Sequence, residues 1–285
     1  METTVVVTTV GGPWLTEQLE ALTRQTHPPE QIVLVNNGRA GVVDAVLDRW
    51  RHHLPQLEFV EDRSVAVCGY ARNTGAARAR YPGLLFLDDD DVAHHGYVEA
   101  MGRALQDADL VAARIDLARL NRGTLVQRWG DMQATGAMAH HGFLPWVIGG
   151  ACGVRREVFD KVGGFDTGFL VAEDTDFCWR AQLDAAAQLA FVPDAVLSYR
   201  LRTDLRPAFR QARLWAEWDA ALHRRFRSQG LPPPGRQLRA VLRWGRPLLV
   251  AARARSRDDL VVAARLLGAC VGRLQGSVRF RQLAL

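Results

Sequence analysis

Two acidic clusters in this chain have the residue types from which a reaction site could be built. The first lies in LLFLDDDDVAHHG, residues 84–96, where four consecutive aspartates follow an apolar run. The second is the pair Glu173 and Asp174, which stands at the start of a predicted helix. Each cluster also has a purely structural interpretation, because carboxylates cap helices and are stabilised at helix N-termini by the helix dipole.

The aspartate run suits a hard divalent cation. Neighbouring carboxylates repel one another and ionise together most easily when a cation lies between them. Such cations prefer oxygen ligands, and Mg²⁺ is commonly held by one or two carboxylates plus substrate phosphates. The position of Asp88 to Asp91 directly behind a buried strand favours a metal–diphosphate site over a solvated loop. We expect Asp91 to cap the helix near His95, and neither His94 nor His95 to bind the metal.

The first half of the chain alternates between strand and helix patterns. Short β-branched or apolar runs predict strands, and apolar residues at helical spacing predict helices between them. The predicted strands are TTVVVTTV, QIVLVNNG, LEFVED, GLLFL and ADLVAARI. This alternation predicts an α/β fold with a doubly wound, mostly parallel sheet flanked by helices, in which ligands bind beyond the carboxyl ends of the strands. Thr8-Thr9, Asn36-Asn37 and the aspartate run would then meet at one edge.

The second half is less regular. LAFVPDAVLSYRLR predicts two short strands separated by a Pro-Asp turn, and TLVQRWGDMQATGAM predicts a helix. After Arg202 the pattern becomes helical and basic, and LPPPG, residues 231–235, marks a break before two further helices. We therefore expect a sheet domain over residues 1–205 and a basic helical C-terminal extension over residues 206–285.

Charge is divided unevenly along the 285 residues. Residues 200–285 hold 19 arginines against five acidic residues, whereas residues 1–199 hold 17 basic and 26 acidic residues. The arginine-rich helices could lie on an anionic membrane, or pack on their own domain with the arginine heads reaching water. We favour packing and keep peripheral membrane contact as the alternative. No nucleic-acid-binding motif accompanies the charge, so we expect no nucleic acid partner.

No targeting or membrane-spanning segment is evident in the sequence. The N-terminus METTVVVTTVGG predicts a strand, without a basic stretch or a cleavage site. No uninterrupted apolar run is long enough to cross a bilayer. The four cysteines are far apart and lack metal-type spacing, which is typical of reduced thiols. We expect a cytoplasmic protein, with the inner face of the membrane as the place of any peripheral contact.

Five segments together resemble the family 2 glycosyltransferases, which have the nucleotide-sugar-binding GT-A fold. Residues 5–38 look like the opening strand, helix and strand of that family, and ARNTGAARA resembles its next helix. FLDDDDV is similar to its DXD motif, GGACGVRREVFDKVGGFDTGF to its acceptor-side wall, and AEDTDFCWRAQ to its ED motif. The resemblance covers residues 3 to 202, and it implies an inverting, metal-dependent hexosyl- or deoxyhexosyltransferase that uses a nucleotide-diphosphate sugar.

The resemblance also implies a role for each matched position. The residues that would line the nucleotide and sugar are Thr8, Thr9, Val10, Asn36, Asn37, Arg72, Asn73, Asp88 and Asp89. Asn36 would face the base, and Asp88 and Asp89 the ribose and sugar. Asp88 and Asp90 would hold Mn²⁺ or Mg²⁺ at the diphosphate, with Asp90 as the principal ligand. Asp174 would be the general base that deprotonates an acceptor hydroxyl, and Glu173 would assist it.

Three positions depart from the family pattern. The second strand ends in Asn36-Asn37 where aspartates are more usual, and Val10-Gly11 replaces an aromatic–Asn pair. Ser198-Tyr199-Arg200 stands where many members have a histidine that completes the metal shell. The third metal ligand is therefore left open, with Arg200 or Arg202 as a cationic substitute at the phosphates.

Two other functions compete with this interpretation. A sugar-nucleotide nucleotidyltransferase would want a Gly-rich, basic phosphate loop after the first strand, and TTVGGPWLTEQ has glycines but no basic residue. A non-catalytic carbohydrate- or membrane-binding protein that kept the fold would not need both the aspartate run and Glu173-Asp174. The favoured interpretation is a transferase acting on a hydroxyl-bearing acceptor, which could be a glycan, a lipid-linked molecule or a small molecule.

Overall fold

The computed structural model describes residues 1–139, 142–233 and 238–282 of the chain, which form two compact units. The sheet unit comprises Met1–Leu120, Asp131–Met138 and Leu144–Arg200. The helical unit comprises Asn121–Gly130, Ala139–Phe143 and Leu201–Leu285. Two short segments from the middle of the chain therefore belong with the C-terminal helices. The functional division expected between residues 205 and 206 stays a prediction.

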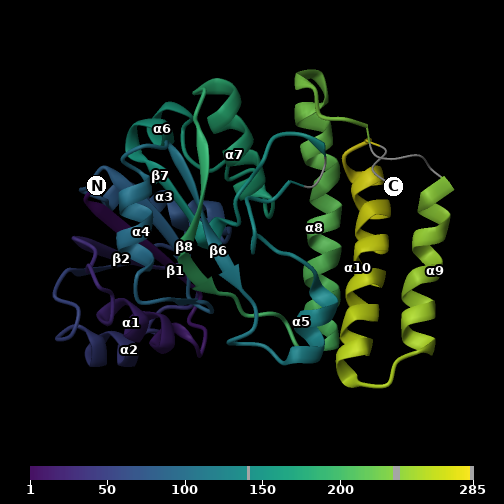
Figure 1. The fold of residues 1–285 in the computed structure, drawn as a ribbon, viewed down its shortest axis with the longest axis horizontal. Helices are drawn as coiled ribbons and strands as arrows, with labels where there is room; N and C mark the ends of the chain where they lie inside the picture. The colour runs from purple at the N-terminus through teal and green to yellow at the C-terminus, as the bar shows by residue number, and fades with distance from the viewer. Residues whose placement is uncertain (140–141, 234–237, 283–285) are drawn as a thin grey trace. The chain divides into compact units, whose positions relative to one another are not determined.

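The sheet unit is built on eight strands in the order β3-β2-β1-β4-β7-β6-β8-β5 (Figure 1). The strands are β1 (Thr3–Thr9), β2 (Gln31–Asn36), β3 (Leu57–Glu61), β4 (Gly83–Asp88), β5 (Val92–Ala93), β6 (Leu110–Asp116), β7 (Cys152–Arg155) and β8 (Leu189–Ser198). β3, β2, β1 and β4 are parallel, as are β6 and β8. β7 is antiparallel to both β4 and β6, and β5 is antiparallel to β8. The predicted α/β class with a mostly parallel sheet is confirmed.

Parallel pairing aligns the ends of β2, β1 and β4. Thr8 pairs with Asp88, and Thr9 pairs with Asn36. Every residue of β1 and β2 is buried, which is typical of central parallel strands covered on both faces. Because the aliphatic side chains stay inside, only the polar ends of these strands reach the sheet edge. The predicted meeting of the three strand ends at one edge is confirmed.

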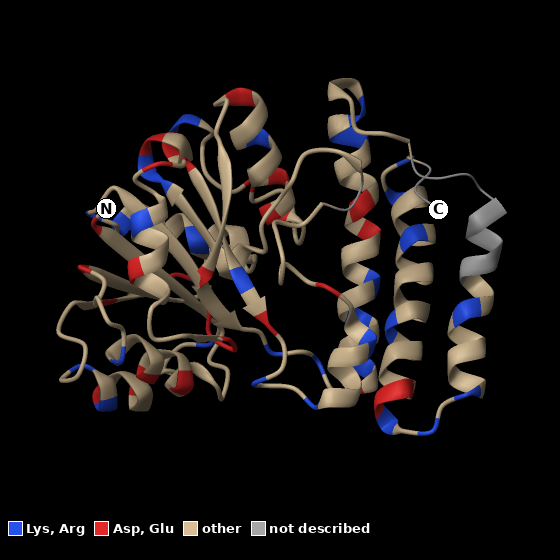
Figure 2. Ribbon diagram, in the orientation of Figure 1, with Lys and Arg blue, Asp and Glu red and all other residues tan. Residues whose placement is uncertain are grey.

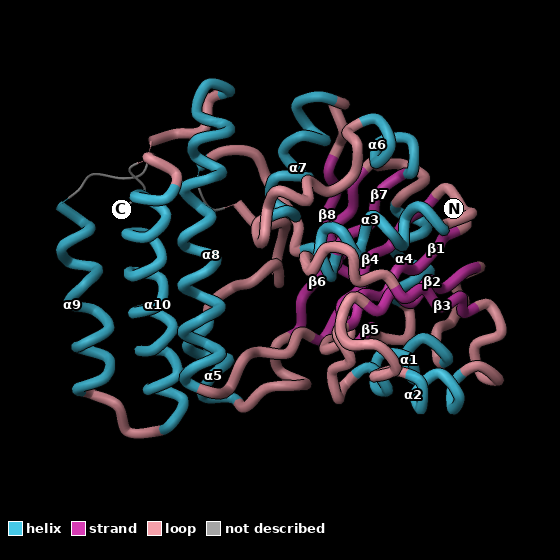
Figure 3. The backbone as a smooth tube through the Cα atoms, turned by 180° about the vertical axis from the view of Figure 1, so that it is seen from behind, coloured by secondary structure: helices cyan, strands magenta, loops and turns pink. Residues whose placement is uncertain are grey.

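Helices flank the sheet (Figures 1 and 3). They are α1 (Leu15–Thr23), α2 (Asp44–Trp50), α3 (Cys68–Arg78), α4 (Tyr97–Ala104), α6 (Arg156–Lys161) and α7 (Glu173–Asp184). The short 3-10 turn η2 (Gly149–Ala151) precedes β7. In α1 the leucines at positions 15, 19 and 22 are all buried, because helical spacing puts them on one face. α7 begins directly after Ala172, whose φ of 65° is in the left-handed region.

Two predicted elements differ from the structure. LAFVPDAVLSYRLR forms one strand, β8, because Pro193 falls in a shift of the pairing with β6 between Ala113 and Arg114. A proline is tolerated at such an irregularity, where its missing N–H is not needed in the ladder. TLVQRWGDMQATGAM is helical only over α5 (Gly123–Trp129), since Gly130 adopts a φ of 86° and ends the helix.

The helical unit contains α5, α8 (Leu205–Phe226), the short η3 (Arg227–Gln229), α9 (Leu238–Ala252) and α10 (Arg257–Arg279). α10 lies between α8 and α9 (Figures 1 and 3). It begins with a capping box, in which the Ser256 hydroxyl accepts from Asp259 N and the Asp259 carboxylate accepts from Ser256 N at 3.1 Å. The two helices predicted after the LPPPG break are confirmed.

Candidate active site

The carboxyl-terminal ends of β1 and β4 bring two hydroxyls against two carboxylates. The Thr8 hydroxyl donates to Asp88 Oδ1 at 3.2 Å, and the Thr9 hydroxyl hydrogen-bonds Asp89. The backbone N–H of Gly12 donates to Asp89 Oδ2 at 3.2 Å. The hydroxyls at the end of β1 therefore hold the first two aspartates of the run in place.

The four aspartates of the run are not equivalent. The side chain of Asp88 is 29% exposed, whereas Asp91 is only 1% exposed and accepts from Arg200 N at 2.9 Å. Burial, reinforced by the charges of Asp90 and Asp88, raises the pKa of Asp91 well above its ordinary value. The expectation that Asp91 caps the next helix is wrong, because α4 begins beyond it and its N-cap, Gly96, makes no side-chain cap. Asp91 instead ties the end of β4 to the end of β8.

Arg72 links the two acidic clusters that the sequence singles out. It projects from α3 and is 3% exposed. Its guanidinium donates to Asp88 Oδ1 at 2.9 Å and to Glu173 Oε1 at 2.6 Å. The same group lies 5.5 Å from the centroid of the Phe165 ring. The structure thus brings the aspartate run and the Glu173-Asp174 pair together around one buried cation.

Asp174 is held by backbone donors on both of its oxygens. Its Oδ2 accepts from Gly149 N at 3.0 Å, and its Oδ1 accepts from Thr175 N at 2.7 Å. Burial raises the pKa of Asp174 above its ordinary value, although Arg72 and these two N–H groups act to lower it. Burial, together with the negative charge of Asp174, raises the pKa of Glu173 to about 7. The two carboxyls therefore titrate as an interacting pair.

The Gly149-Gly150 turn fits closely over this network. A Cβ on Gly149 would lie 2.5 Å from the Arg72 guanidinium, and a Cβ on Gly150 would lie 2.6 Å from the Asp88 carboxylate. Any larger residue would displace the side chain beneath it, because real Cβ atoms essentially never approach so closely. The same turn donates Gly149 N to Asp174. Both glycines therefore leave the space that the Arg72 and Asp88 side chains occupy against the turn.

The side-chain amides of Asn36 and Asn37 form hydrogen bonds with nearby backbone groups. Asn36 Nδ2 donates to Arg39 O at 2.8 Å, and Asn36 Oδ1 accepts from Gly38 N at 2.9 Å. Asn37 Nδ2 donates to Val65 O at 2.8 Å. These bonds shape the loops after β2 and β3. A direct contact of either amide with a nucleobase stays a prediction.

Val10 and Asn73 lie in contrasting surroundings. Val10 is 67% exposed. Asn73 Nδ2 donates to Phe165 O at 2.8 Å, and Phe165 N donates to Asn73 Oδ1 at 2.9 Å. Asn73 therefore clamps α3 to the segment that leads to α7. The nucleotide-binding roles implied for these two residues also stay predictions.

Gln18 is a site residue that the sequence analysis missed. It is fully buried, donates to Asp88 O at 3.3 Å and accepts from Ala93 N at 3.0 Å. It thereby supports the backbone on both sides of the aspartate run. The available signal was an amide on the otherwise apolar buried face of α1.

Arg200 lies against the aspartate run from the end of β8. Its Nε donates to Asp90 O at 2.9 Å, and its terminal nitrogen donates to Glu17 at 2.7 Å. The guanidinium lies 5.0 Å from the centroid of the Trp14 ring. A cation therefore stands beside Asp90 where the family pattern often has a histidine.

Asp88 and Asp90 offer carboxylate oxygens of the kind that a hard divalent cation prefers. Within residues 1–139, 142–233 and 238–282, no three His, Cys, Asp or Glu side chains cluster so as to hold a metal ion by themselves. His94 hydrogen-bonds the Ser198 hydroxyl at 2.8 Å, and its Nε2 lies 4.0 Å from Asp116 Oδ2. The donor set therefore fits Mg²⁺ or Mn²⁺ only if phosphate oxygens of a ligand complete the shell.

The sequence model of one family, described as Glycosyl transferase family 2, matches residues 3–163. The chain belongs to this family. That match includes β1, β4 and the aspartate run but ends before Glu173. The resemblance seen in the sequence is confirmed, and in this member of glycosyl transferase family 2 Arg72 contacts both Asp88 and Glu173.

Two curated relatives are also glycosyltransferases by name. A pre-mycofactocin glycosyltransferase of Mycobacterium tuberculosis is 31% identical over 145 residues, which cover 48% of this family 2 chain and 30% of that protein. The match therefore spans less than a third of the mycobacterial protein's length. An uncharacterized glycosyltransferase of Bacillus subtilis, YwdF, is 28% identical over 200 residues, which cover 63% of this chain and 67% of YwdF.

Solved structures of S. aureus TarS are similar in fold. One superposes with a TM-score of 0.57 at 16% identity, over 97% of this chain and 55% of that TarS chain. A shorter TarS chain, in complex with UDP-GlcNAc, superposes with a TM-score of 0.56 at 15% identity, over 99% of this chain and 93% of that one. Identity this low shows a shared GT-A fold alone.

Proposed function

We propose that the protein transfers a hexosyl or deoxyhexosyl group from a nucleotide-diphosphate sugar to an acceptor hydroxyl, with inversion. Membership of glycosyl transferase family 2 supports sugar transfer. The complex of TarS with UDP-GlcNAc, a protein of similar fold, supports a nucleotide-sugar donor. The observation that carries the proposal is the Arg72 link, which joins the aspartate run to Glu173, the neighbour of a buried Asp174 that two backbone N–H groups hold.

Asp174 is the proposed general base. Its two backbone hydrogen bonds fix the orientation of the carboxylate, and Oδ2 keeps a second lone pair for an acceptor hydroxyl, whereas Oδ1 also accepts from the Thr175 hydroxyl at 3.4 Å. Its raised pKa makes it a stronger base once it has lost its proton. The deprotonated hydroxyl would attack the anomeric carbon opposite the leaving diphosphate. A single displacement of this kind inverts that carbon and needs no covalent sugar–enzyme intermediate.

Asp88 and Asp90 are the proposed ligands of Mn²⁺ or Mg²⁺. Such a cation, when bound, would neutralise charge on the leaving diphosphate without any proton transfer. The chain itself positions the ligands, because Thr8 and Arg72 bind Asp88, and Arg200 binds the backbone oxygen of Asp90. Glu173 accepts a hydrogen bond from Arg72 on the side away from Asp88. Because Glu173 is next to Asp174 in the chain, this bond connects the proposed base to the proposed metal ligands.

The acceptor and the cellular location rest on the sequence. We propose a hydroxyl-bearing acceptor, which could be a glycan, a lipid-linked molecule or a small molecule. We also propose that the enzyme acts in the cytoplasm.

A donor panel tests the proposal. The protein is incubated with UDP-, GDP-, dTDP- and CDP-sugars, with and without Mn²⁺, while nucleotide release and thermal shift are recorded. We expect one nucleotide class to raise the melting temperature and to be hydrolysed slowly, both in a metal-dependent way. Absence of binding and of hydrolysis across the panel would contradict the proposal. Pyrophosphate release from a nucleoside triphosphate and a sugar 1-phosphate would instead support the nucleotidyltransferase alternative.

A further inference from the structure

One face of α10 is committed to packing against α8. Gly268, Gly272 and Gly276 recur every four residues on that face. A Cβ at these positions would lie 2.0–2.3 Å from backbone carbonyl oxygens of α8. Only glycine allows two helices to approach so closely. The packing expected for the basic extension therefore accounts for this face, and α10 also packs against α9 and α5.

A second face of α10 is apolar and reaches solvent. Its exposed residues are Leu260 at 41%, Leu267 at 39%, Leu274 at 43% and Val278 at 80%. Residues 264 and 271, an alanine and a valine, fall on the same face by the helical repeat and are half-buried. No charged residue occupies this stripe. A continuous exposed apolar stripe of this kind marks an interaction surface.

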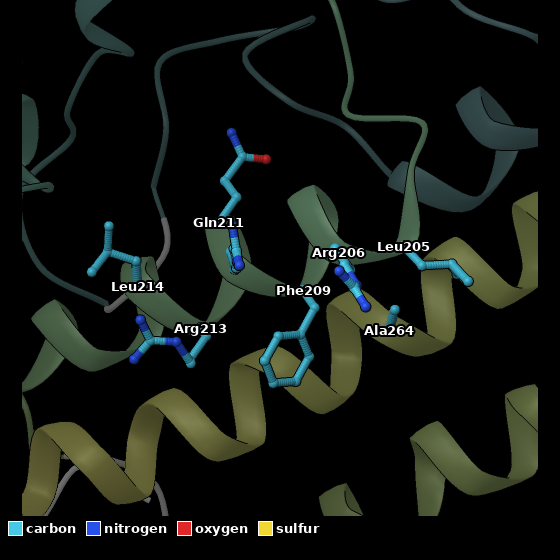
Figure 4. Close-up of a pocket in the computed structure, with 8 residues that line it drawn as sticks. Leu205, Arg206, Phe209, Gln211, Arg213, Leu214 and Ala264 are labelled. Atoms are coloured by element: carbon cyan, nitrogen blue, oxygen red, sulfur yellow. The ribbon is translucent and has the colours of Figure 1, made fainter.

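Basic side chains border the stripe on the α8 side. A groove of about 760 Å³ follows the α8–α10 seam, and its lining includes Leu205, Arg206, Phe209, Arg210, Arg213 and Ala264. A second hollow continues it along Arg213, Glu217, Leu274, Gln275, Val278 and Arg279. Figure 4 shows Phe209 lying over α10, with Arg206 and Arg213 to either side. Among the described residues, no ion pair is found for Arg206 or Arg210.

The acidic residues of the C-terminal segment do not neutralise Arg206 or Arg210, because each of them is engaged elsewhere within the unit. Asp204 pairs with Arg257, and Glu217 pairs with Arg213 and Arg279. Asp259 pairs with Arg128, and Asp258 hydrogen-bonds the Thr124 hydroxyl. Burial raises the pKa of Asp219 to about 7, against the effect of Arg273. The α8–α10 surface therefore combines the apolar stripe with arginines, and basic residues outnumber acidic ones along the two helices (Figure 2).

We infer that this α8–α10 surface docks on an anionic lipid bilayer. Apolar side chains in an exposed helical stripe can enter the acyl boundary, while bordering arginines bind anionic headgroups. A second copy of the chain would bring like charges together, since a two-fold interface uses the same patch on both sides. A nucleic acid would satisfy the arginines but leave the apolar stripe in water.

The helix is expected to lie on the membrane rather than to cross it. By length and composition, α10 is the one described helix apolar enough to span a bilayer. Of its most apolar 18-residue stretch, 39% is buried within the protein. Crossing would require α10 to leave α8, and the glycine contacts hold the two helices together. Docking by the exposed stripe leaves those contacts intact.

Vesicle co-sedimentation of the full chain tests the inference. The probes are vesicles of phosphatidylcholine alone and vesicles of phosphatidylcholine with about a third of phosphatidylglycerol, an anionic lipid. We expect binding to the anionic vesicles only, and weaker binding at high salt because salt screens the arginines. The variants Leu274→Glu with Val278→Glu, and Arg206→Gln with Arg210→Gln, should each reduce binding by about tenfold or more.

Controls separate docking from folding and from self-association. Leu183→Glu, an exposed leucine of α7, should bind as the wild type does. Circular dichroism and donor hydrolysis should be unchanged in all variants, so that failure of docking and failure of the proposed function are distinguishable. Equal binding to neutral vesicles, no binding to either, or binding unaffected by the variants would overturn the inference. A dimer in ultracentrifugation that the apolar variant dissolves, without vesicle binding, would assign the surface to a second copy.

Discussion

Arg72 is the residue on which both acidic clusters depend. Its guanidinium is almost fully buried between Asp88 and Glu173. Burying a cation is costly unless it is paired, and removing one partner of a buried pair leaves an uncompensated charge. The site is therefore a chain of hydrogen bonds in which each member fixes the next, from Thr8 through Asp88 and Arg72 to Glu173.

Replacing Arg72 should destabilise the protein far more than replacing an exposed arginine of the same helix. Arg72→Gln leaves two carboxylates without their cation, and we expect a loss of about 3–5 kcal/mol in the free energy of unfolding. The matched control is Arg78→Gln, whose side chain is 59% exposed and 3.7 Å from Glu58. That change should cost about 0–1 kcal/mol. Urea unfolding measures the free energy of unfolding of both variants. Similar losses in the two variants would contradict a stabilising role for the buried Arg72 ion pairs.

Glu173 should make stability depend on pH. Its pKa is raised by burial from 4.5 to about 7 in the folded protein. Its contribution to stability is thus fully present below pH 4.5 and is lost as the pH rises through 7. Glu173→Gln removes this titration, so the melting temperature of the wild type should fall relative to that of the variant over this range. If the difference in melting temperature between the wild type and Glu173→Gln stays constant from pH 4 to pH 8, the raised pKa of Glu173 is contradicted.

The η2 turn shows how a short element sets the geometry of the whole site. Its two glycines cover Arg72 and Asp88, and one of its N–H groups holds Asp174. Gly150→Ala should push the Asp88 carboxylate aside and lower donor turnover by about 100-fold, since a displacement of about 1 Å can have that effect. Gly136→Ala, where a Cβ meets nothing within 4 Å, is the control. Equal turnover in the two variants would show that the fit over Asp88 is unimportant.

The sequence predicts elements whose pattern repeats and misses those that tertiary packing decides. The meeting of Thr8-Thr9 with Asp88 follows from parallel strands alone, so it could be predicted. The bridge made by Arg72 could not, because a helical pattern does not tell which arginine turns inward. The sequence predicts two strands where β8 is one, because the effect of Pro193 depends on how the neighbouring strand β6 pairs with it. Gln18 shows the same limit, because its backbone partners are distant in sequence.

At the scale of the whole molecule, the acidic and basic parts of the chain fall in different units. The aspartate run and the Glu173-Asp174 pair lie in the sheet unit, and most of the basic excess lies in the helical unit. The family match ends at residue 163, whereas the fold similarity to TarS extends over 97% of the chain. The proposed base therefore lies outside the matched sequence and needs its own test.

The most direct test of the central claim measures donor binding and sugar transfer for Asp174→Asn, with the donor identified by the panel. The account predicts donor affinity close to that of the wild type and a fall in kcat of about 10²- to 10⁴-fold, the range that a general base supplies. Glu157→Gln, an exposed acid of α6 with 73% of its side chain accessible, should behave as the wild type. Turnover by Asp174→Asn at the rate of the wild type would contradict the account.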